Sequence, residues 1–170
     1  RTPLRITLGG GGTDLPSYYS DYGGFLVSAT INKYVYIILN PRFENSIRVS
    51  YSKTEIAENV DAVQHPIVRE ALRLVGLGPG LEIVSVADLP SNTGLGSSST
   101  FTVGLLNALH TFKRDHVSPT QLAEEAYTIE VEILKEPIGK QDQYIGAFGG
   151  ITRLEIERDG QVNVSPLKIH

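Results

Sequence analysis

The sequence predicts an α+β domain, and three observations support this class. Strand-like runs occupy both ends of the chain, while segments with helical periodicity lie between them. The order is strands, helix, strand, two helices and strands, which differs from the strict strand–helix alternation of a parallel α/β sheet. The 170 residues are 41% hydrophobic, which is enough for one domain with a substantial core.

The N-terminal half contains the shorter elements. β-Rich runs predict strands at residues 4–8, 25–31, 34–39 and 47–51. Pro66 can open a helix over 66–75, which the glycine-rich segment GLGPG then ends. A further strand is predicted at 81–87.

The C-terminal half contains two longer helices and a hairpin. Apolar residues at helical spacing predict the first helix: Phe101, Leu105, Ala108, Leu109 and Phe112. Ser118, as N-cap, opens the second, whose buried stripe is Leu122, Ala126, Ile129 and Ile133. Residues 150–156 and 161–167 are predicted to form a hairpin around Asp159-Gly160.

Charge and composition exclude several functional classes. The net charge is −4, and no basic patch is visible, so a nucleic-acid or anionic-membrane partner is not expected. The absence of Cys excludes disulfide scaffolds and thiolate metal sites. Neither a signal peptide nor an apolar run of about 18 residues is present, and we expect a cytoplasmic protein.

The segment LPSNTGLGSSST, residues 89–100, has the composition of a phosphate loop. Gly94 and Gly96 permit positive φ, and the following helix start exposes backbone N–H groups toward an anion. A serine hydroxyl there could also ligate Mg²⁺. Local chemistry equally allows a serine-rich N-cap in a tight turn, and the lysine of a Walker A loop is absent.

Two further segments carry candidate polar groups. After the run GGGGTD, Asp14 could bind sugar hydroxyls between tyrosines at 18, 19 and 22, or it could cap a short helical turn. The segment EPIGKQDQYIGAFGG is expected to form a glycine-flanked loop. In it, Asp142 could be the base that accepts a hydroxyl proton, or a surface carboxylate paired with Lys140 or Lys135. Glu130 lies on a partly buried helix flank, where a carboxylate usually needs a cation or metal.

The serine–glycine segment resembles the second motif of the GHMP kinases, a superfamily that includes galactokinase, homoserine kinase and mevalonate kinase. The resemblance rests on Pro-x-x-x-Gly-Leu-Gly-Ser-Ser-Ser. It implies that this loop wraps the ATP phosphates and that Ser98 is a Mg²⁺ ligand. The implied nucleotide-binding residues are Pro90, Gly94, Leu95, Gly96, Ser97, Ser98 and Ser99.

The other two segments resemble further motifs of the same superfamily. The N-terminal run is similar to the galactokinase-type motif Arg-x-Asn-Leu-Ile-Gly-Glu-His-Thr-Asp, with Arg5 on its arginine and Asp14 on its sugar-binding aspartate. The implied substrate residues are Gly11, Gly12, Thr13 and Asp14. Gly11 and Gly12 replace the Glu and His of that motif, which argues against galactose and suits a larger substrate, such as one already bearing a phosphate.

The segment around Asp142 matches Gly-Ile-Met-Asp-Gln, whose aspartate is the catalytic base in galactokinases. The resemblance implies that Asp142 is the base and Arg5 its catalytic partner, and that Glu130, twelve residues earlier, joins Ser98 in holding Mg²⁺. It also implies that residues 1–170 are the N-terminal ATP-binding domain, with a mixed sheet packed against helices as in domain 2 of ribosomal protein S5. The C-terminal domain with a third glycine-rich motif is absent, so catalysis by these residues alone is in question.

The expected function is therefore transfer of the ATP γ-phosphoryl group to a sugar or sugar phosphate. Within the superfamily the chain most resembles the D-glycero-D-manno-heptose 7-phosphate kinases, which phosphorylate the anomeric C1 hydroxyl. A fucokinase or another sugar-1-kinase is the nearest alternative. From other classes, a non-catalytic sugar or nucleotide sensor stays open, and an S5-like RNA-binding protein is disfavoured by the acidic balance.

Overall fold

A computed structural model describes residues 1–90 and 94–168 of the chain. The strands are β1 (Thr2–Gly9), β2 (Gly24–Pro41), β3 (Ile47–Ser50), β4 (Thr54–Ala57), β5 (Leu81–Ala87), β6 (Ile151–Ile156) and β7 (Val162–Pro166). The α-helices are α1 (Pro16–Tyr22), α2 (Pro66–Val75), α3 (Ser97–Lys113), α4 (Pro119–Tyr127) and α5 (Gln141–Phe148). A 3₁₀ turn, η1 (Val60–Ala62), precedes α2, and a π-helical turn, η2 (Thr128–Ile133), continues α4.

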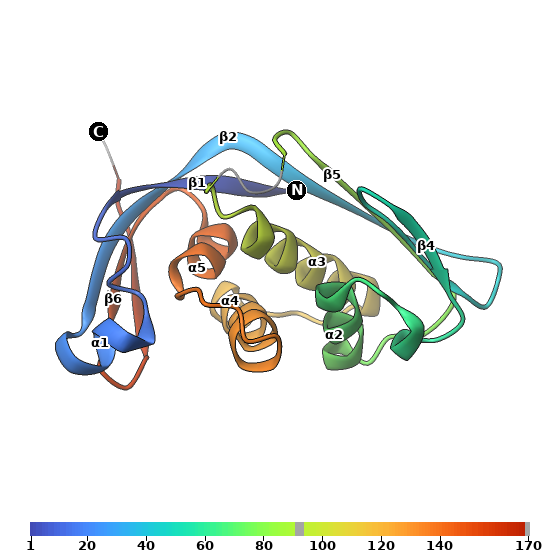
Figure 1. Cartoon of the computed structure of the whole chain (residues 1–170). Coiled ribbons are helices and arrows are strands. Elements are labelled where there is room, and N and C mark those ends of the chain that lie inside the picture. Colours follow the sequence, from blue (N-terminus) through green and yellow to red (C-terminus); the bar gives the residue numbers. More distant parts are fainter. Residues whose placement is uncertain (91–93, 169–170) are drawn as a thin grey trace.

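Within these residues the strands form one mixed sheet built around β2. The order is β4-β3-β5-β2-β6-β7. Strand β1 lies outside this order and also pairs with β2. All pairs are antiparallel except β3 with β5. The 18-residue β2 bends so that its first half pairs with β6 and its second half with β5. The sheet therefore curves over the helices instead of lying flat (Figure 1).

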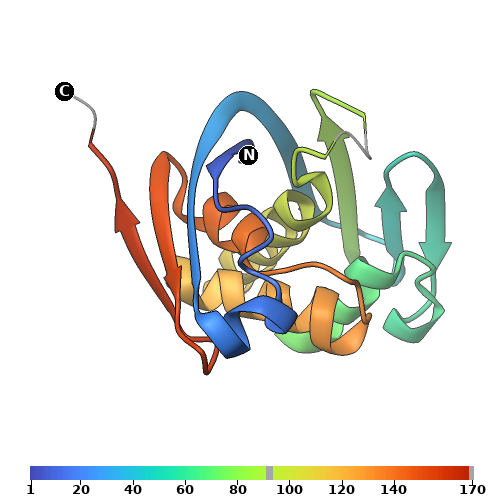
Figure 2. The ribbon, with the colours of Figure 1, turned by 60° about the vertical axis from the view of Figure 1, so that its left-hand side comes forward.

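The helices α2 to α5 cover one face of the curved sheet, as both views show (Figures 1 and 2). Helix α3 lies at the centre and contributes Val103, Leu105, Leu106 and Leu109 to the larger core cluster. It approaches β1 closely at Gly104, where a Cβ atom would lie 2.6 Å from Thr2 Oγ1. A smaller cluster joins β2 and β6 to α5 through residues such as Leu26, Leu154 and Tyr144. None of the described helices combines the length and the apolar character that a bilayer crossing requires.

The α+β class is confirmed, as are the bounds of helix 66–75 and strand 81–87. The segments 25–31 and 34–39, predicted as two strands, form one continuous strand. Asn32 and Lys33, which separate the two apolar runs in the sequence, lie within this strand and are exposed to solvent. The segment around Asp142 was expected to be a loop, which is wrong. It forms α5, which is stabilised by burial of Tyr144 and Ile145 more than by its helix propensity.

Candidate active site

A glycine-rich turn brings the chain into α3, as the phosphate-loop hypothesis requires. Gly94 and Gly96 both have positive φ, 73° and 75°, and Gly96 is the N-cap of α3. The first-turn N–H groups of α3 have no partner within the helix, so this end of the 17-residue helix can receive an anion. Ser98 is exposed at this end, whereas Ser99 is buried. Residues 91–93 of the predicted loop lie outside the described residues.

Asp142 and Arg5, which are 137 residues apart in the sequence, form an ion pair beside this turn. Arg5 Nε donates to Asp142 Oδ1 at 2.6 Å, and Nη2 lies 2.6 Å from the same oxygen. Arg5 Nη1 also donates to the carbonyl of Gly94 at 2.9 Å. A Cβ atom on Gly96 would lie 3.1 Å from Asp142 Oδ2, so glycine, which also suits the positive φ here, favours this close approach. The arginine thus fixes the carboxylate against the turn that starts α3.

The alternative pairing of Asp142 with Lys140 or Lys135 is wrong. Asp142 lies in the first turn of α5. Residues two apart at a helix start point in different directions, and Lys140 Nζ instead bonds Glu124 Oε1 of α4 at 3.0 Å. Lys140 also lies over the ring of Tyr127, and Tyr144 donates its hydroxyl to Glu124. This buried cluster fastens the start of α5 to α4 and so contributes to the position of Asp142.

Asp14 is 2% exposed, and its carboxylate connects the glycine run to the start of α5. Its Oδ1 accepts from Gly12 N at 3.2 Å, and its Oδ2 accepts from Gln141 N at 3.0 Å. It does not cap α1, whose N-cap is Leu15 and which has no side-chain cap. Thr13 Oγ1 donates to the Gly10 carbonyl and accepts from Phe25 N, which closes the turn. Gly11, whose Cβ would lie 3.1 Å from Thr7 Cγ2, packs against β1.

A cavity of about 240 Å³ opens between this turn and α5. Its lining residues are Arg5, Gly12, Asp14, Leu15, Ile138, Gly139, Gln141 and Asp142. The structure therefore brings together Arg5, Gly12, Asp14 and Asp142 from the predicted set. The tyrosine walls are wrong, because Tyr19 is buried and neither Tyr18 nor Tyr22 lines the cavity. Residues such as Ile138 and Gln141 carried no sequence signal, since only the tertiary fold brings them to Asp14.

Replacing Gly139 with alanine is expected to destabilise the protein and to displace Asp14. A Cβ atom there would lie 2.1 Å from Asp14 Oδ2 and 2.6 Å from the Asp14 carbonyl oxygen. Such overpacking costs about 1–3 kcal/mol, measurable by denaturant unfolding. The matched control is Gly78→Ala, because a Cβ on Gly78 meets nothing within 4 Å. Equal stability of the two variants would contradict the close contact between Gly139 and Asp14.

Glu130 is fully buried, at 0% exposure, in the π-helical turn η2. Ser98 Oγ donates to its Oε1 at 2.8 Å, and Gln143 Nε2 donates to its Oε2 at 2.9 Å. Desolvation nevertheless raises the pKa of this carboxyl above its ordinary value, because the hydrogen bonds from Ser98 and Gln143 only partly offset burial. The predicted pair of Ser98 and Glu130 is thus in direct contact at the start of α3.

The donor set around Glu130 fits Mg²⁺. It consists of oxygens, and Mg²⁺ is commonly held by one or two protein ligands together with substrate phosphates. Gln143 Oε1 is buried and has no hydrogen-bond partner among the described residues, so the site has unsatisfied acceptor capacity. A cation with its water shell would satisfy both this oxygen and the buried carboxylate charge.

A larger cavity of about 670 Å³ includes Ser97 and Ser98 in its lining and shares no lining residue with the smaller one. Apolar and aromatic side chains line most of it, among them Val35, Tyr51, His65, Ile67 and Phe101. The ring centroids of His65 and Phe101 are 5.2 Å apart, and Tyr51 meets His65 edge-on. An apolar wall with aromatic rings that ends at an anion-binding helix start suits a base attached to phosphates. Sequence reasoning identified only Pro90 and the serines of this cavity.

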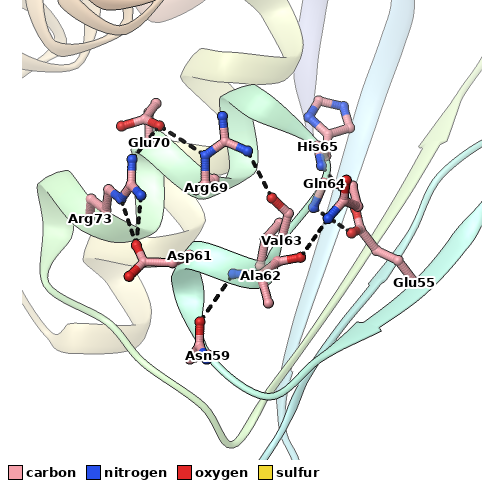
Figure 3. Close-up of polar contacts among 10 residues, drawn as sticks. All are labelled: Glu55, Asn59, Asp61, Ala62, Val63, Gln64, His65, Arg69, Glu70 and Arg73. Carbon is pink, nitrogen blue, oxygen red and sulfur yellow. Dashed lines mark hydrogen bonds and ion pairs between the residues drawn. The ribbon is translucent and has the colours of Figure 1, made fainter.

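Glu55 holds His65 at this wall (Figure 3). Its two carboxylate oxygens accept from the backbone N–H groups of Gln64 and His65, at 2.6 and 3.1 Å. Arg69 Nη1 donates to the Val63 carbonyl and so fixes the same segment from α2. Burial lowers the pKa of His65, which is therefore neutral at pH 7 and can stack as an uncharged ring.

Comparison with known proteins identifies the family. Residues 52–150 match the family model of the GHMP kinases N terminal domain. Over 99% of its length the chain is 33% identical to the D-glycero-alpha-D-manno-heptose 7-phosphate kinase of Campylobacter jejuni, of which it covers 53%. The chain belongs to the GHMP kinase family. This membership confirms the resemblance found in the three motifs.

The fold of this GHMP kinase domain is shared with solved structures. It matches the crystal structure of a D-glycero-D-manno-heptose 1-phosphate kinase from Bacteroides thetaiotaomicron with a TM-score of 0.93 and 30% identity, covering 99% of this chain and 59% of that one.

A second relative by sequence is the L-fucokinase/L-fucose-1-P guanylyltransferase of Bacteroides fragilis. It is 27% identical over 92% of this chain and 20% of its own length. The chain thus spans about half the length of the heptose kinase relatives, at 53% and 59%.

Proposed function

We propose that this GHMP kinase domain is the nucleotide-binding half of a sugar kinase that transfers the γ-phosphoryl group of ATP to a sugar hydroxyl. The observation that carries the proposal is the position of Asp142. Its carboxylate contacts the turn that starts α3 on one side and lines the 240 Å³ cavity on the other. A base in this position can reach a hydroxyl group and a phosphate at the same time.

The two cavities suit the two substrates of such a reaction. The adenine base would stack in the 670 Å³ cavity against His65 and Phe101, with the phosphates on the N–H groups of residues 94–99. The sugar would bind in the smaller cavity beside Asp14 and Asp142. Ser98, which follows the glycine-rich turn, lines the first cavity. Arg5 lines the second and donates to the Gly94 carbonyl of the same turn.

In the proposed reaction the sugar oxygen bonds to the γ-phosphorus as the bond from that phosphorus to the β–γ bridging oxygen breaks, and ADP leaves. The hydroxyl proton passes to an oxygen of Asp142. Arg5 keeps this carboxylate in place through the two contacts of its guanidinium with Oδ1. Most of the rate enhancement then comes from positioning and fixed charges.

Ser98 and Glu130 would hold Mg²⁺, which neutralises phosphate charge during transfer. Ser98 offers its hydroxyl from the first turn of α3, and Glu130 offers a buried carboxylate. Gln143 orients that carboxylate through its amide N–H. These three residues would therefore form a metal-binding site next to the nucleotide phosphates.

For the sugar we propose D-glycero-D-manno-heptose 7-phosphate, phosphorylated at its anomeric C1 hydroxyl. Support comes from the named heptose kinase relatives and from Gly11 and Gly12, which lack the Glu and His side chains that a galactokinase-type motif has at these positions. Fucose is the second candidate, because the Bacteroides fragilis relative is named as an L-fucokinase.

The test is ADP release by the full-length protein with Mg·ATP and heptose 7-phosphate, galactose, fucose or mannose, followed by identification of the product by NMR. Turnover of heptose 7-phosphate to a 1,7-bisphosphate supports the proposal. Turnover of fucose alone keeps the kinase and replaces the substrate. Intact ATP binding without turnover of any sugar would contradict the proposal and favour a sensor.

A further inference from the structure

Gln141 is held in a defined orientation at the boundary between the glycine run and the sugar cavity. Its backbone N–H donates to Asp14 Oδ2 at 3.0 Å, and its side-chain Oε1 accepts from Thr7 Oγ1 at 2.8 Å. It lines the same 240 Å³ cavity as Asp142, its neighbour in the first turn of α5. The contact with Asp14 therefore fixes the backbone of Gln141, and the contact with Thr7 of β1 orients its side-chain amide before any ligand binds.

The remaining half of this amide is available for a ligand. With Oε1 engaged by Thr7, the amide Nε2 has two N–H donors. Nε2 donates no hydrogen bond within residues 1–90 and 94–168. It lies 3.9 Å from the position that a Cβ atom on Gly11 would occupy, so no side chain at position 11 covers it. A preoriented donor beside an empty space is a suitable contact for a ligand oxygen.

We infer that Gln141 is a specificity-determining residue whose amide Nε2 donates a hydrogen bond to a hydroxyl oxygen of the sugar. This inference rests on the proposed function, since it assigns a contact within the same sugar site. It adds a residue that binds the acceptor and does not transfer the proton. Thr7 is then a positioning residue, because it acts on the sugar only through the orientation of Gln141.

The charge of the cavity favours a hydroxyl over a phosphate as the ligand group that accepts from Gln141 Nε2. Its charged lining residues are Arg5, Asp14 and Asp142, which gives a formal charge of −1, and Arg5 is already paired with Asp142. A phosphate group of the acceptor would be repelled here, whereas a neutral hydroxyl accepts from an amide without charge. The phosphate of a sugar phosphate would therefore point away from Gln141.

The test uses the full-length protein and the variant Gln141→Met, which keeps the side-chain length and removes both donors. Methionine is also the residue of the galactokinase-type Gly-Ile-Met-Asp-Gln motif at this position. We expect the KM for the sugar and its calorimetric Kd to rise about 10-fold, while kcat and the KM for ATP change by less than about 2-fold. Thr7→Val should give a smaller rise of the same kind, since the amide is retained but no longer anchored.

Monodeoxy sugars distinguish this contact from a structural effect. The analogue that lacks the contacted hydroxyl should lose about 10-fold in affinity for the wild-type protein and nothing further in Gln141→Met, which a merely structural role would not produce. Gln161→Met, at an exposed position outside the cavity, is the matched control. Unchanged sugar affinity in Gln141→Met, or additive losses with every analogue, would overturn the inference.

Calorimetry separates this inference from the proposed function. If the wild-type protein binds sugar but does not phosphorylate it, the kinase proposal fails while the Kd comparison still tests Gln141. If phosphorylation occurs and the variant has the wild-type KM and Kd, only the inference about Gln141 fails. Absence of any sugar binding to the wild-type protein would overturn both.

Discussion

Asp142→Asn is expected to lower the turnover of the full-length protein by at least ~100-fold, the scale for loss of acid–base catalysis. Asparagine has nearly the same shape, and its Oδ1 can still accept from Arg5 Nε, so the geometry of the pair is retained. What is lost is the ability to take the hydroxyl proton. The KM for ATP should change little, because Asp142 does not line the larger cavity. Steady-state ADP release at saturating sugar measures the effect.

Asp21→Asn is the control for this variant, since Asp21 is exposed on α1 and lines neither cavity. It should retain wild-type turnover. A loss of less than 10-fold in Asp142→Asn would mean that another group takes the proton or that the hydroxyl transfers it to the phosphate. The role of the Arg5–Asp142 pair would then be structural.

Glu130→Gln is expected to abolish most activity and, in the same protein, to increase the stability of the ligand-free fold. Loss of the carboxylate removes the charge that would hold Mg²⁺ against the phosphates, a contribution of several kcal/mol, or ~100-fold or more in rate. The KM for Mg²⁺ should rise as well. Full activity of the variant would exclude Glu130 as a metal ligand. Glu132→Gln, at an exposed position on the same turn, provides the comparison.

The stability gain follows from the direction of the Glu130 pKa shift. The folded pKa is raised above the ordinary value of 4.5, so the folded state binds this proton more tightly than the unfolded state. Wild-type stability is therefore lost as the pH rises from about 4.5 through the raised pKa, and the variant avoids this loss. Gln143, whose buried Oε1 has no described partner, can turn to accept from the new amide.

Thermal unfolding without metal or nucleotide measures this effect. The Tm of Glu130→Gln should exceed that of the wild-type protein at pH 8, by about 2–4 °C for each kcal/mol of burial cost removed. The difference should shrink as the pH falls toward 4.5. A constant difference across the pH range would contradict the raised pKa.

Local chemistry predicted those parts of the site that contiguous residues form. Gly94, Gly96 and the serines define a helix start by their own conformational preferences, so the turn and its exposed N–H groups could be read directly. The same holds for helix 66–75, which begins at Pro66 and ends at Gly76 with a left-handed φ of 72°. In these cases the residue type and the backbone conformation determine each other.

The partners of the charged groups could not be predicted in this way. Lys140 is close to Asp142 in sequence, yet the fold gives Asp142 to Arg5 and Lys140 to Glu124. Helix α5 was missed because its glycine-flanked sequence has weak periodicity, and its helical state depends on packing against α3, α4 and β2. Gln141 was missed for the same reason, since its neighbours come from β1 and the glycine turn.

The continuity of β2 makes the two cavities parts of one cooperative unit. Ser28 and Ala29 pair with β1 on one edge and with β6 on the other, while Val35 pairs with β1 and β5. One end of the strand thus supports the glycine turn beside the smaller cavity, and Val35 lines the larger cavity. Local unfolding at either end of β2 must break hydrogen bonds between β1 and β2, and this pairing extends to the other end. The amides of these three residues should accordingly exchange with solvent only through global unfolding, and a nucleotide bound in one cavity should slow subglobal opening of the other.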